Sequence, residues 1–249
     1  MTYQCLRKPN VSYNLEMLAF LPIKEHSERI PGKNFRLLRD KPLFMWIIDA
    51  LLLSKGIDEI IIDTDSTAPE LLDLRKNQRI TIKERNFNLR GDHVSMNLLL
   101  KDFILSTTDE TFLMTHVTNP FISQKTIEEA ILEYSKALSN GYDSLVSVDK
   151  FQSRFYDDTF SPINHDPKML LRTQDLSPIY QENSCLYIFT KKSFLGNQNN
   201  RVGSRPLLFE TPKLESIDID IEEDWTIAEI IAKYFASDCN TGRVGNEEI

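Results

Sequence analysis

The sequence predicts an α/β protein in which a mostly parallel sheet carries helices on both faces. Short apolar runs that suit buried strands alternate with longer segments of helical character, and this alternation is typical of parallel sheets. The chain has 249 residues, of which 41% are hydrophobic, so it can bury one sizeable core. With only 8 Gly and 11 Pro, its composition excludes disordered, collagen-like and low-complexity proteins.

The pattern begins with a strand. Residues 17–23 (MLAFLPI) form a continuous apolar run, which predicts a buried strand, and the polar residues 24–34 predict a long loop after it. Residues 43–54 are an apolar stretch of helical character, and residues 59–63 (EIIID) predict a second buried strand. A short helix is expected over residues 69–76, because proline fits the first turn of a helix.

The alternation continues through the middle of the chain. Residues 80–83 predict a short strand and residues 95–106 a helix. Residues 111–115 (TFLMT) predict a strand, residues 124–138 a helix and residues 144–148 another strand. Strands that alternate with helices in this way indicate parallel pairing.

The rhythm breaks after residue 148. Residues 151–175 are rich in Asp, Ser, Pro, Asn and Arg and show no long period, which predicts an insertion or a hairpin subdomain. Strands are expected again over residues 184–190 and 215–220. Residues 222–235 predict a closing helix, because large apolar side chains recur there at helical spacing.

We therefore expect one domain over residues 15–236, with the insertion at about residues 150–182. Residues 1–14 are expected to form an N-terminal extension and residues 237–249 a C-terminal tail. No internal repeat is visible in the sequence.

Charge and cysteine content exclude several classes of protein. The chain has 29 Lys and Arg against 37 Asp and Glu, a net charge of -8, which argues against a non-specific binder of nucleic acid or of membrane surfaces. Cys5, Cys185 and Cys239 are widely spaced and show no metal-binding pattern, so a reducing compartment is expected. Without a visible secretory signal or a membrane-spanning run, the prediction is a cytoplasmic protein.

The loop after the first strand is a candidate polyphosphate site. It gathers three cations and two small polar side chains: Lys24, Ser27, Arg29, Lys33 and Asn34. Cations neutralise phosphate oxygens, and ligands of open parallel sheets bind beyond the carboxyl ends of the strands. The loop is not a Walker A motif, because the upstream glycine is absent. The alternative interpretation is a solvated basic loop with an ordinary turn.

A pair of carboxylates is the second candidate. In a strand over residues 215–220, Asp218 and Asp220 would share one face, and isoleucines would occupy the other. Two carboxylates can hold Mg²⁺ together with substrate phosphates, so the pair would complement the basic loop. The alternative is a half-buried strand with a solvated acidic face.

Two further polar segments follow or enter predicted strands. His116, Thr118 and Asn119 supply neutral hydrogen-bonding groups that suit a base edge or a ribose, although an ordinary turn explains them equally. The polar residues 180–184 precede an apolar run, where they would contact a second substrate or simply close a loop.

In this order, the motifs resemble the acylneuraminate (CMP-sialic acid) cytidylyltransferase family over about residues 17–235. The resemblance lies in residues 29–34 (RIPGKN), 41–43 (KPL), 63–65 (DTD), 118–120 (TNP), 180–183 (YQEN) with 186–189 (LYIF), and 216–220 (SIDID). It implies a Rossmann-like nucleotidyltransferase that makes a CMP-sugar from CTP and a nine-carbon 2-keto acid sugar, a nonulosonic acid, and releases pyrophosphate. Each motif alone is weak, and the ordered set is specific.

The resemblance also assigns roles. It implies that the first loop holds the triphosphate, that Asp218 and Asp220 bind Mg²⁺, and that the inserted segment contributes to a homodimer. By position, the nucleotide would be bound further by Arg85, Ser95, His116 and Thr118. The acid sugar would be received by Arg172, Gln174, Tyr180, Glu182 and Asn183.

This sequence departs from the family pattern at substrate contacts. The first loop usually begins with Arg and has Lys after the Ser, whereas Lys24 and Glu28 stand there. His116 replaces a glutamine, Thr173 a second arginine, and Ser184 a glycine. Two alternatives follow: a cytidylyltransferase for another acidic acceptor, such as a different keto-acid sugar or a phosphonate, and a non-catalytic nucleotide-binding homologue.

Overall fold

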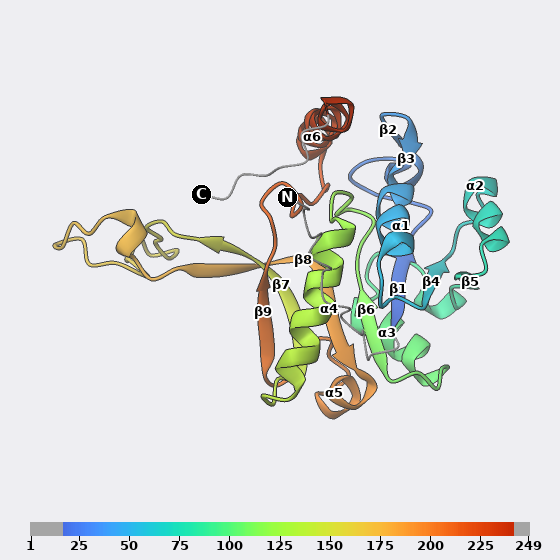
Figure 1. The fold of residues 1–249 in the computed structure, drawn as a ribbon, viewed down its shortest axis with the longest axis horizontal. Coiled ribbons are helices and arrows are strands. Elements are labelled where there is room, and N and C mark those ends of the chain that lie inside the picture. The colour runs from blue at the N-terminus through green and yellow to red at the C-terminus, as the bar shows by residue number, and fades with distance from the viewer. Residues whose placement is uncertain (1–16, 242–249) are drawn as a thin grey trace, which may run out of the picture.

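A seven-stranded sheet forms the centre of the molecule (Figure 1). The computed structural model describes residues 17–241, with side chains as far as residue 236. Seven strands build the sheet: β1 (Leu18–Ile23), β4 (Glu59–Thr64), β5 (Ile80–Glu84), β6 (Thr111–Met114), β7 (Ser144–Phe151), β8 (Ile179–Thr190) and β9 (Pro206–Glu210). Their spatial order is β5-β4-β1-β6-β8-β7-β9.

Most of the sheet is parallel, as predicted. β8 runs antiparallel to its neighbours β6 and β7, and the other pairs are parallel. The chain builds the β4 and β5 side of β1 first and then returns to add β6 on the other side. This reversal of strand order opens a crevice beyond the carboxyl ends of β1 and β6, where ligands of such sheets bind.

Helices cover both faces of the sheet, again as predicted. One buried cluster joins the sheet to α1 (Leu43–Leu53), α4 (Gln124–Leu138) and α6 (Glu222–Thr241), and a second joins it to α3 (Met96–Leu105) and α5 (Lys191–Gly196). Successive residues of β1 divide between the clusters, with Ala19 and Leu21 in the first and Leu18 and Phe20 in the second. The alternation of side chains along a strand explains why a continuous apolar run was needed here.

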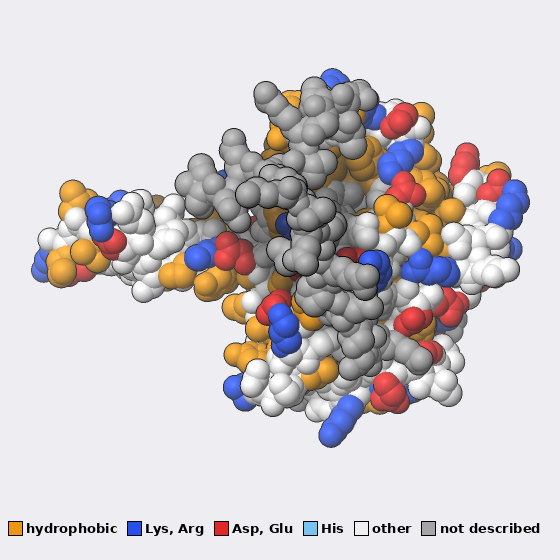
Figure 2. Space-filling model, in the orientation of Figure 1, with side chains coloured by type: hydrophobic (Ala, Val, Ile, Leu, Met, Phe, Trp, Pro, Cys, Tyr) orange, Lys and Arg blue, Asp and Glu red, His pale blue; other side chains and the backbone are white. Residues whose placement is uncertain are grey.

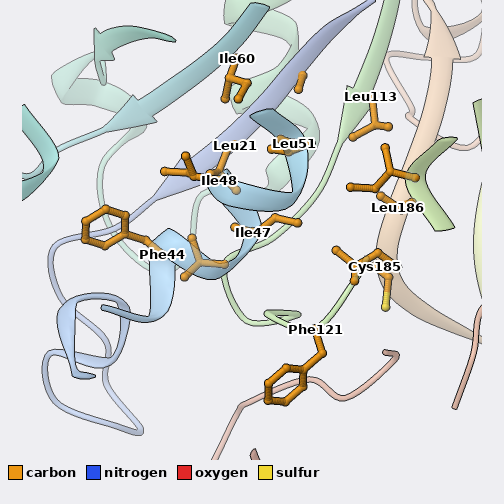
Figure 3. Close-up of a cluster of buried hydrophobic side chains, with 14 of the residues drawn as sticks. Leu21, Phe44, Ile47, Ile48, Leu51, Ile60, Leu113, Phe121, Cys185 and Leu186 are labelled. Atoms are coloured by element: carbon orange, nitrogen blue, oxygen red, sulfur yellow. The ribbon is translucent and has the colours of Figure 1, made fainter. Parts of the chain in front are cut away.

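The first cluster fixes the helix that follows the phosphate-loop candidate. Figure 3 shows Ile47, Ile48 and Leu51 of α1 beside Leu21 of β1 and Ile60 of β4, all of them fully buried. Burial of an aliphatic side chain of this size stabilises a fold by about 1.5–3 kcal/mol. The start of α1, and with it the end of the loop, is thereby held against the sheet.

Several elements differ from the prediction in length or kind. The expected helix over residues 69–76 is one α-helical turn, α2 (Pro69–Leu72), continued by the 3-10 turn η2 (Asp73–Lys76). The closing helix α6 continues to Thr241, five residues past the expected end of the domain at residue 236. The expected N-terminal extension, residues 1–14, lies outside the described residues.

The predicted strand over residues 215–220 is wrong, and β9 was missed. Residues 215–220 have no strand pairing, whereas Pro206–Glu210 pair in parallel with β7. The alternation of Ile with Asp suits an exposed strand, but a strand also needs a neighbour to accept its hydrogen bonds. Here the place beside β7 is taken by β9.

The predicted insertion is an arm that projects from the sheet (Figure 1). β7 and β8 stay paired as far as Phe151 and Ile179, well beyond the expected strand ends, and residues 152–178 connect them. The connection contains one isolated bridge, between Tyr156 and Pro162, and the 3-10 turn η4 (Thr173–Asp175).

Within residues 17–241, none of the helices has the length and apolar character needed to span a membrane. Cys185 is a free, buried thiol.

Candidate active site

A cavity of about 510 Å³ opens beyond β1 and β6. Its walls come from the loop after β1, the end of β6, the start of α3 and the segment before α6. The cavity therefore lies at the reversal of strand order. Nine of the predicted site residues line it: Lys24, Ser27, Arg29, Lys33, Asn34, Arg85, His116, Thr118 and Asp220.

The loop of residues 24–34 is shaped by its own backbone. Gly32 has a φ of 66°, a left-handed conformation that favours glycine, and it begins the 3-10 turn η1 (Lys33–Phe35). The Asn34 amide donates a 2.7 Å hydrogen bond to the Lys24 carbonyl, which closes the loop on itself. Asn34 is buried and therefore serves the shape of the loop in this structure.

Three cations of the loop face the cavity, each beside an acceptor. The Lys24 ammonium lies 2.9 Å from Asp92, and the Arg29 guanidinium lies 2.7 Å from Asp220. The Lys33 ammonium donates a 2.5 Å hydrogen bond to the Ile219 carbonyl and lies 3.6 Å from Asp220. These contacts show that each cation of the loop can bind an oxygen acceptor at the cavity.

Burial makes Lys33 the least solvated of the three. Desolvation lowers the pKa of Lys33, and the charges of Asp220 and Asp218 oppose that effect. A desolvated ammonium is a stronger electrostatic partner for a phosphate than an exposed one, because the surroundings screen it less.

Asp218 and Asp220 are carried by an irregular segment rather than by a strand. The Ile219 amide donates a 2.9 Å hydrogen bond to the Thr118 carbonyl, and the buried Ile219 side chain anchors the segment. The Asp224 carboxylate accepts hydrogen bonds of 2.9 Å from the amides of Asp220 and Ile221, which caps the start of α6. The two carboxylates are thus fixed by β6 and by the helix.

The two carboxylates open onto different cavities. Asp220 lines the first cavity, and Asp218 lines a second cavity of about 500 Å³ beside the base of the arm. Asp218 is exposed toward that cavity, but protein atoms around its other sides desolvate it and raise its pKa, and a hydrogen bond from the Thr118 side chain opposes this shift. The nearby charge of Asp220 raises the pKa of Asp218 further.

Arg85 is a buried cation with one free edge. Its Nε donates a 2.6 Å hydrogen bond to Asp63, and its Nη2 donates to the backbone carbonyls of Asp63 and Ile23. Nη1 is buried and has no partner among the residues that the structure describes, although Arg85 lines the first cavity. An unpaired charged donor of this kind indicates a ligand acceptor, because leaving it unpaired is unfavourable.

His116 is a neutral imidazole at the end of β6. Burial, and to a smaller extent the positive charge of Arg201, lowers the pKa of His116 to about 3. At neutral pH the ring therefore offers one donor and one acceptor, as the readout of a neutral base requires.

The remaining predicted residues lie outside the two cavities. Ser95 is exposed and begins α3 next to Met96, which does line the first cavity. Arg172 and Gln174 lie on the arm, where Arg172 forms a two-point ion pair with Asp175 at 2.7 and 3.0 Å. Tyr180 is exposed where the arm joins β8.

Glu182 and Asn183 are held by neighbouring side chains. Glu182 accepts a hydrogen bond from Tyr187. The Asn183 amide is buried and donates to Thr211 at 2.7 Å and to Asp149 at 3.2 Å, and both of these acceptors line the second cavity. Asn183 therefore supports the wall of that cavity rather than lining it.

Sequence reasoning assigned no individual role to three residues near the site, although Asp63 lies in the 63–65 motif and Asp92 lies in the segment between Arg85 and Ser95 that resembles the nucleotide-binding segment of the family. Asp63 orients Arg85, Asp92 pairs with Lys24, and Arg201 lies close enough to His116 to affect its pKa. Asp63 and Asp92 stand in segments already singled out, so a search for counter-ions of the predicted cations would have found them. Arg201 stands in no recognisable motif.

Comparison with known proteins identifies the family. Residues 19–219 match the family described as cytidylyltransferase. The CMP-N,N'-diacetyllegionaminic acid synthase of Legionella pneumophila is 30% identical over 86% of this chain and 95% of its own length. The N-acylneuraminate cytidylyltransferase of Streptococcus agalactiae serotype V is 29% identical over 85% of this chain, which spans 52% of that longer protein.

The fold agrees with this assignment. A solved CMP:2-keto-3-deoxy-manno-octonic acid synthetase in complex with CTP superposes with a TM-score of 0.61 at 11% identity, over 89% of this chain and 99% of its own. The predicted resemblance is therefore confirmed. The protein belongs to the cytidylyltransferase family, in the group of nucleotidyltransferases that includes the CMP-nonulosonate synthetases.

Proposed function

We propose that this protein transfers CMP from CTP to the anomeric hydroxyl of a nonulosonic acid and releases pyrophosphate. The observation that carries the proposal is the first cavity of a cytidylyltransferase chain, in which three loop cations face an aspartate beyond the carboxyl ends of β1 and β6. A full-length relative in the same size range is named as a synthase of this kind.

The loop of residues 24–34 would bind the triphosphate. Lys24, Arg29 and Lys33 now pair with carboxylates or a carbonyl, and phosphate oxygens would replace those acceptors. Ser27 lines the same cavity and would add a neutral donor, while Asn34 holds the loop closed.

The nucleoside would lie between β6 and Arg85. His116 stays neutral, and Thr118 and Arg85 line the same cavity, so together they would offer neutral and charged donors to a pyrimidine and its ribose. Ser95, at the exposed start of α3, would contact the nucleotide from the rim.

Asp218 and Asp220 would hold a Mg²⁺ ion together with the substrate: the charge of Asp220 raises the pKa of Asp218, and the two carboxylates open onto neighbouring but different cavities. Proteins commonly hold Mg²⁺ with one or two carboxylates together with substrate phosphates. The described residues contain no group of three or more potential ligands, so the pair would need the phosphates to complete a site. Bound Mg²⁺ would supply positive charge to phosphate oxygens and polarise the attacking hydroxyl.

The reaction itself is an in-line displacement. A bond forms between the anomeric oxygen and the α-phosphorus, the bond from that phosphorus to the β-phosphate oxygen breaks, and the hydroxyl proton passes to solvent. The chain contributes mainly position and charge: Lys33 and Arg29 would neutralise the leaving pyrophosphate, and the closed loop would hold the phosphates in line.

The arm supports a homodimer. Phe160 and Leu170 are 87% and 90% exposed on it, and Figure 2 shows further hydrophobic side chains gathered along the arm. Large exposed apolar groups on a projecting hairpin favour burial against a second copy of the chain. In such a dimer, Arg172, Gln174 and Tyr180 would reach the acceptor site of one of the two copies.

The test is pyrophosphate release in the presence of Mg²⁺ from CTP, UTP, ATP and GTP, each with a panel of nonulosonic acids. CTP-dependent release with at least one of these acids is the expected result. Pyrophosphate release only with an octulosonic acid or a phosphonate would show that the acceptor is not a nonulosonic acid. CTP binding without turnover over the whole panel would indicate a non-catalytic homologue.

A further inference from the structure

A cationic side chain that no sequence motif contained lies beside Met114 at the end of β6, two residues before His116, which lines the first cavity. Arg201 follows α5, its side chain is 19% exposed, and its charge contributes to the lowered pKa of the cavity residue His116. Its Nη1 atom lies 3.9 Å from the sulfur of Met114, the last residue of β6, on the side of the sheet covered by α3 and α5.

Tyr187 of β8 holds this guanidinium in place. The central carbon of the guanidinium lies 4.0 Å from the centroid of the Tyr187 ring, and Nη2 donates a 3.1 Å hydrogen bond to the Tyr187 hydroxyl. Tyr187 is itself fully buried and donates to the Glu182 carboxylate, and its hydroxyl oxygen lies 3.1 Å from the Ser184 hydroxyl oxygen. Stacking on a buried ring restricts a guanidinium to a narrow range of positions.

The hydrogen-bonding capacity of Arg201 is poorly filled. Nη1 has the Met114 sulfur at 3.9 Å, a weak acceptor, and the Glu182 carboxylate stands 3.8 Å from Nη2. By contrast, Arg36 donates to both oxygens of Glu222 at 2.8 and 2.9 Å. Arg201 is thus fixed in place, and some of its N–H donors have no strong acceptor and could bind an anion.

The position of Arg201 indicates which anion it would bind. Lys24, Arg29 and Lys33 supply positive charge from the loop after β1, whereas Arg201 lies beside Met114 at the end of β6 and supplies positive charge from a different element. A 2-keto acid sugar carries one carboxylate beside its reacting carbon, and a guanidinium matches a carboxylate with two parallel hydrogen bonds.

We infer that Arg201 binds the carboxylate of the acceptor acid from within the same subunit and thereby sets acceptor specificity. The inference rests on the proposed function. On binding, the carboxylate takes the donors that now face Met114 and Glu182, and Tyr187 keeps the guanidinium plane fixed. The α-phosphate of CTP is the alternative anion for Arg201, so the experiment must distinguish binding of the acceptor carboxylate from binding of CTP.

The experiment compares Arg201→Gln and Arg201→Lys with a matched control, Arg205→Gln. Arg205 also lies over a tyrosine, with its guanidinium carbon 4.8 Å from the centroid of the Tyr142 ring, but it precedes β9 at the amino ends of β7 and β9, whereas the first cavity lies beyond the carboxyl ends of β1 and β6. KM is measured separately for the acid and for CTP with the full-length enzyme.

We expect Arg201→Gln to raise the KM for the acid by about tenfold or more, the range for a lost charged hydrogen bond, and to leave the KM for CTP within about twofold. Arg201→Lys should recover part of the loss, and Arg205→Gln should match wild type. An equal rise in both KM values, or a rise for CTP alone, would assign Arg201 to the nucleotide and overturn the inference.

A second measurement removes the carboxylate charge from the ligand instead. Wild type should bind the acid more tightly than its methyl ester, and Arg201→Gln should bind the two about equally. If wild type turns over an acid but Arg201→Gln keeps the preference over the ester, the inference fails and the proposed function stands. If wild type neither binds nor turns over any of the acids, both fail.

Discussion

The Nε atom of Arg85 donates a 2.6 Å hydrogen bond to the buried carboxylate of Asp63, and Nη1 of the same guanidinium is buried with no hydrogen-bond partner among the described residues. The two residues end adjacent parallel strands, β4 and β5, so the sheet itself brings them together. A buried ion pair contributes little net stability unless it is well hydrogen-bonded. We therefore expect the main role of this pair to be to fix the orientation of the Arg85 guanidinium.

Replacing Arg85 should separate stability from nucleotide binding. Arg85→Ala leaves the buried Asp63 with Lys83, 3.6 Å away, as its remaining cation, which should lower the free energy of unfolding by up to about 3–5 kcal/mol. Arg85→Lys keeps the charge but removes Nη1, so we expect a smaller loss of stability and a rise of about tenfold in the KM for CTP. Urea unfolding and steady-state kinetics measure the two effects.

The control for this pair is Arg75→Lys, on the exposed turn η2. It should change neither quantity. An unchanged KM for CTP in Arg85→Lys would show that the free edge faces no ligand.

Removing the charge of Asp220 should abolish most of the activity. Asp220→Asn loses one of the two proposed Mg²⁺ carboxylates, and we expect kcat to fall by about 100-fold or more at saturating Mg²⁺. Glu222→Gln, two residues away and paired with Arg36 in the described part of the chain, is the matched control and should retain wild-type turnover. Near wild-type turnover of Asp220→Asn would contradict the assignment.

His116 should make the protein less stable in mild acid. Its folded pKa of about 3 lies below the ordinary value of 6.5, so the unfolded chain binds a proton between these values and the folded chain does not. Stability contributed by the neutral ring is complete above pH 6.5 and is lost as the pH falls, by up to about 1.4 kcal/mol per pH unit.

Unfolding of wild type and His116→Gln at several pH values measures this contribution. The pH dependence of wild type between pH 6.5 and 4.5 should be steeper than that of the variant by nearly one proton. Parallel curves for the two proteins would mean that His116 titrates normally.

A charge on the arm should disrupt the proposed dimer. Leu170→Glu places a carboxylate at a side chain that is 90% exposed in the single chain, and burial of that charge in an interface would be unfavourable. We expect sedimentation velocity to show monomers at micromolar concentrations where wild type is dimeric. Leu105→Glu, on α3 and 59% exposed, is the control and should stay dimeric. A monomeric wild type would remove the dimer from the proposal.

The order of strands and helices was readable because local pattern and tertiary role agree. β1, β4 and β6 are buried on both faces, so their apolar runs are continuous, and α4 shows helical spacing with its own Ser123 cap. The strand prediction for residues 215–220 failed because local pattern and tertiary role disagree there. Their alternation of Ile and Asp is typical of a strand, but a strand also needs a neighbouring strand to pair with. The edge of the sheet beside β7 is already occupied by β9.

The sequence by itself determined which residues could carry the chemistry: the cations of the first loop, the carboxylates before α6 and the polar end of β6. Those residues follow strands, and the carboxyl ends of parallel strands meet at one edge of the sheet, so their convergence was predictable. Only the tertiary structure decided that Asp218 and Asp220 open onto separate cavities, that Asp63 orients Arg85, and that Arg201 approaches His116. The last two relationships join side chains from distant segments, and the first depends on where the segment that carries both carboxylates packs, so all three depend on packing across the whole sheet rather than on local pattern.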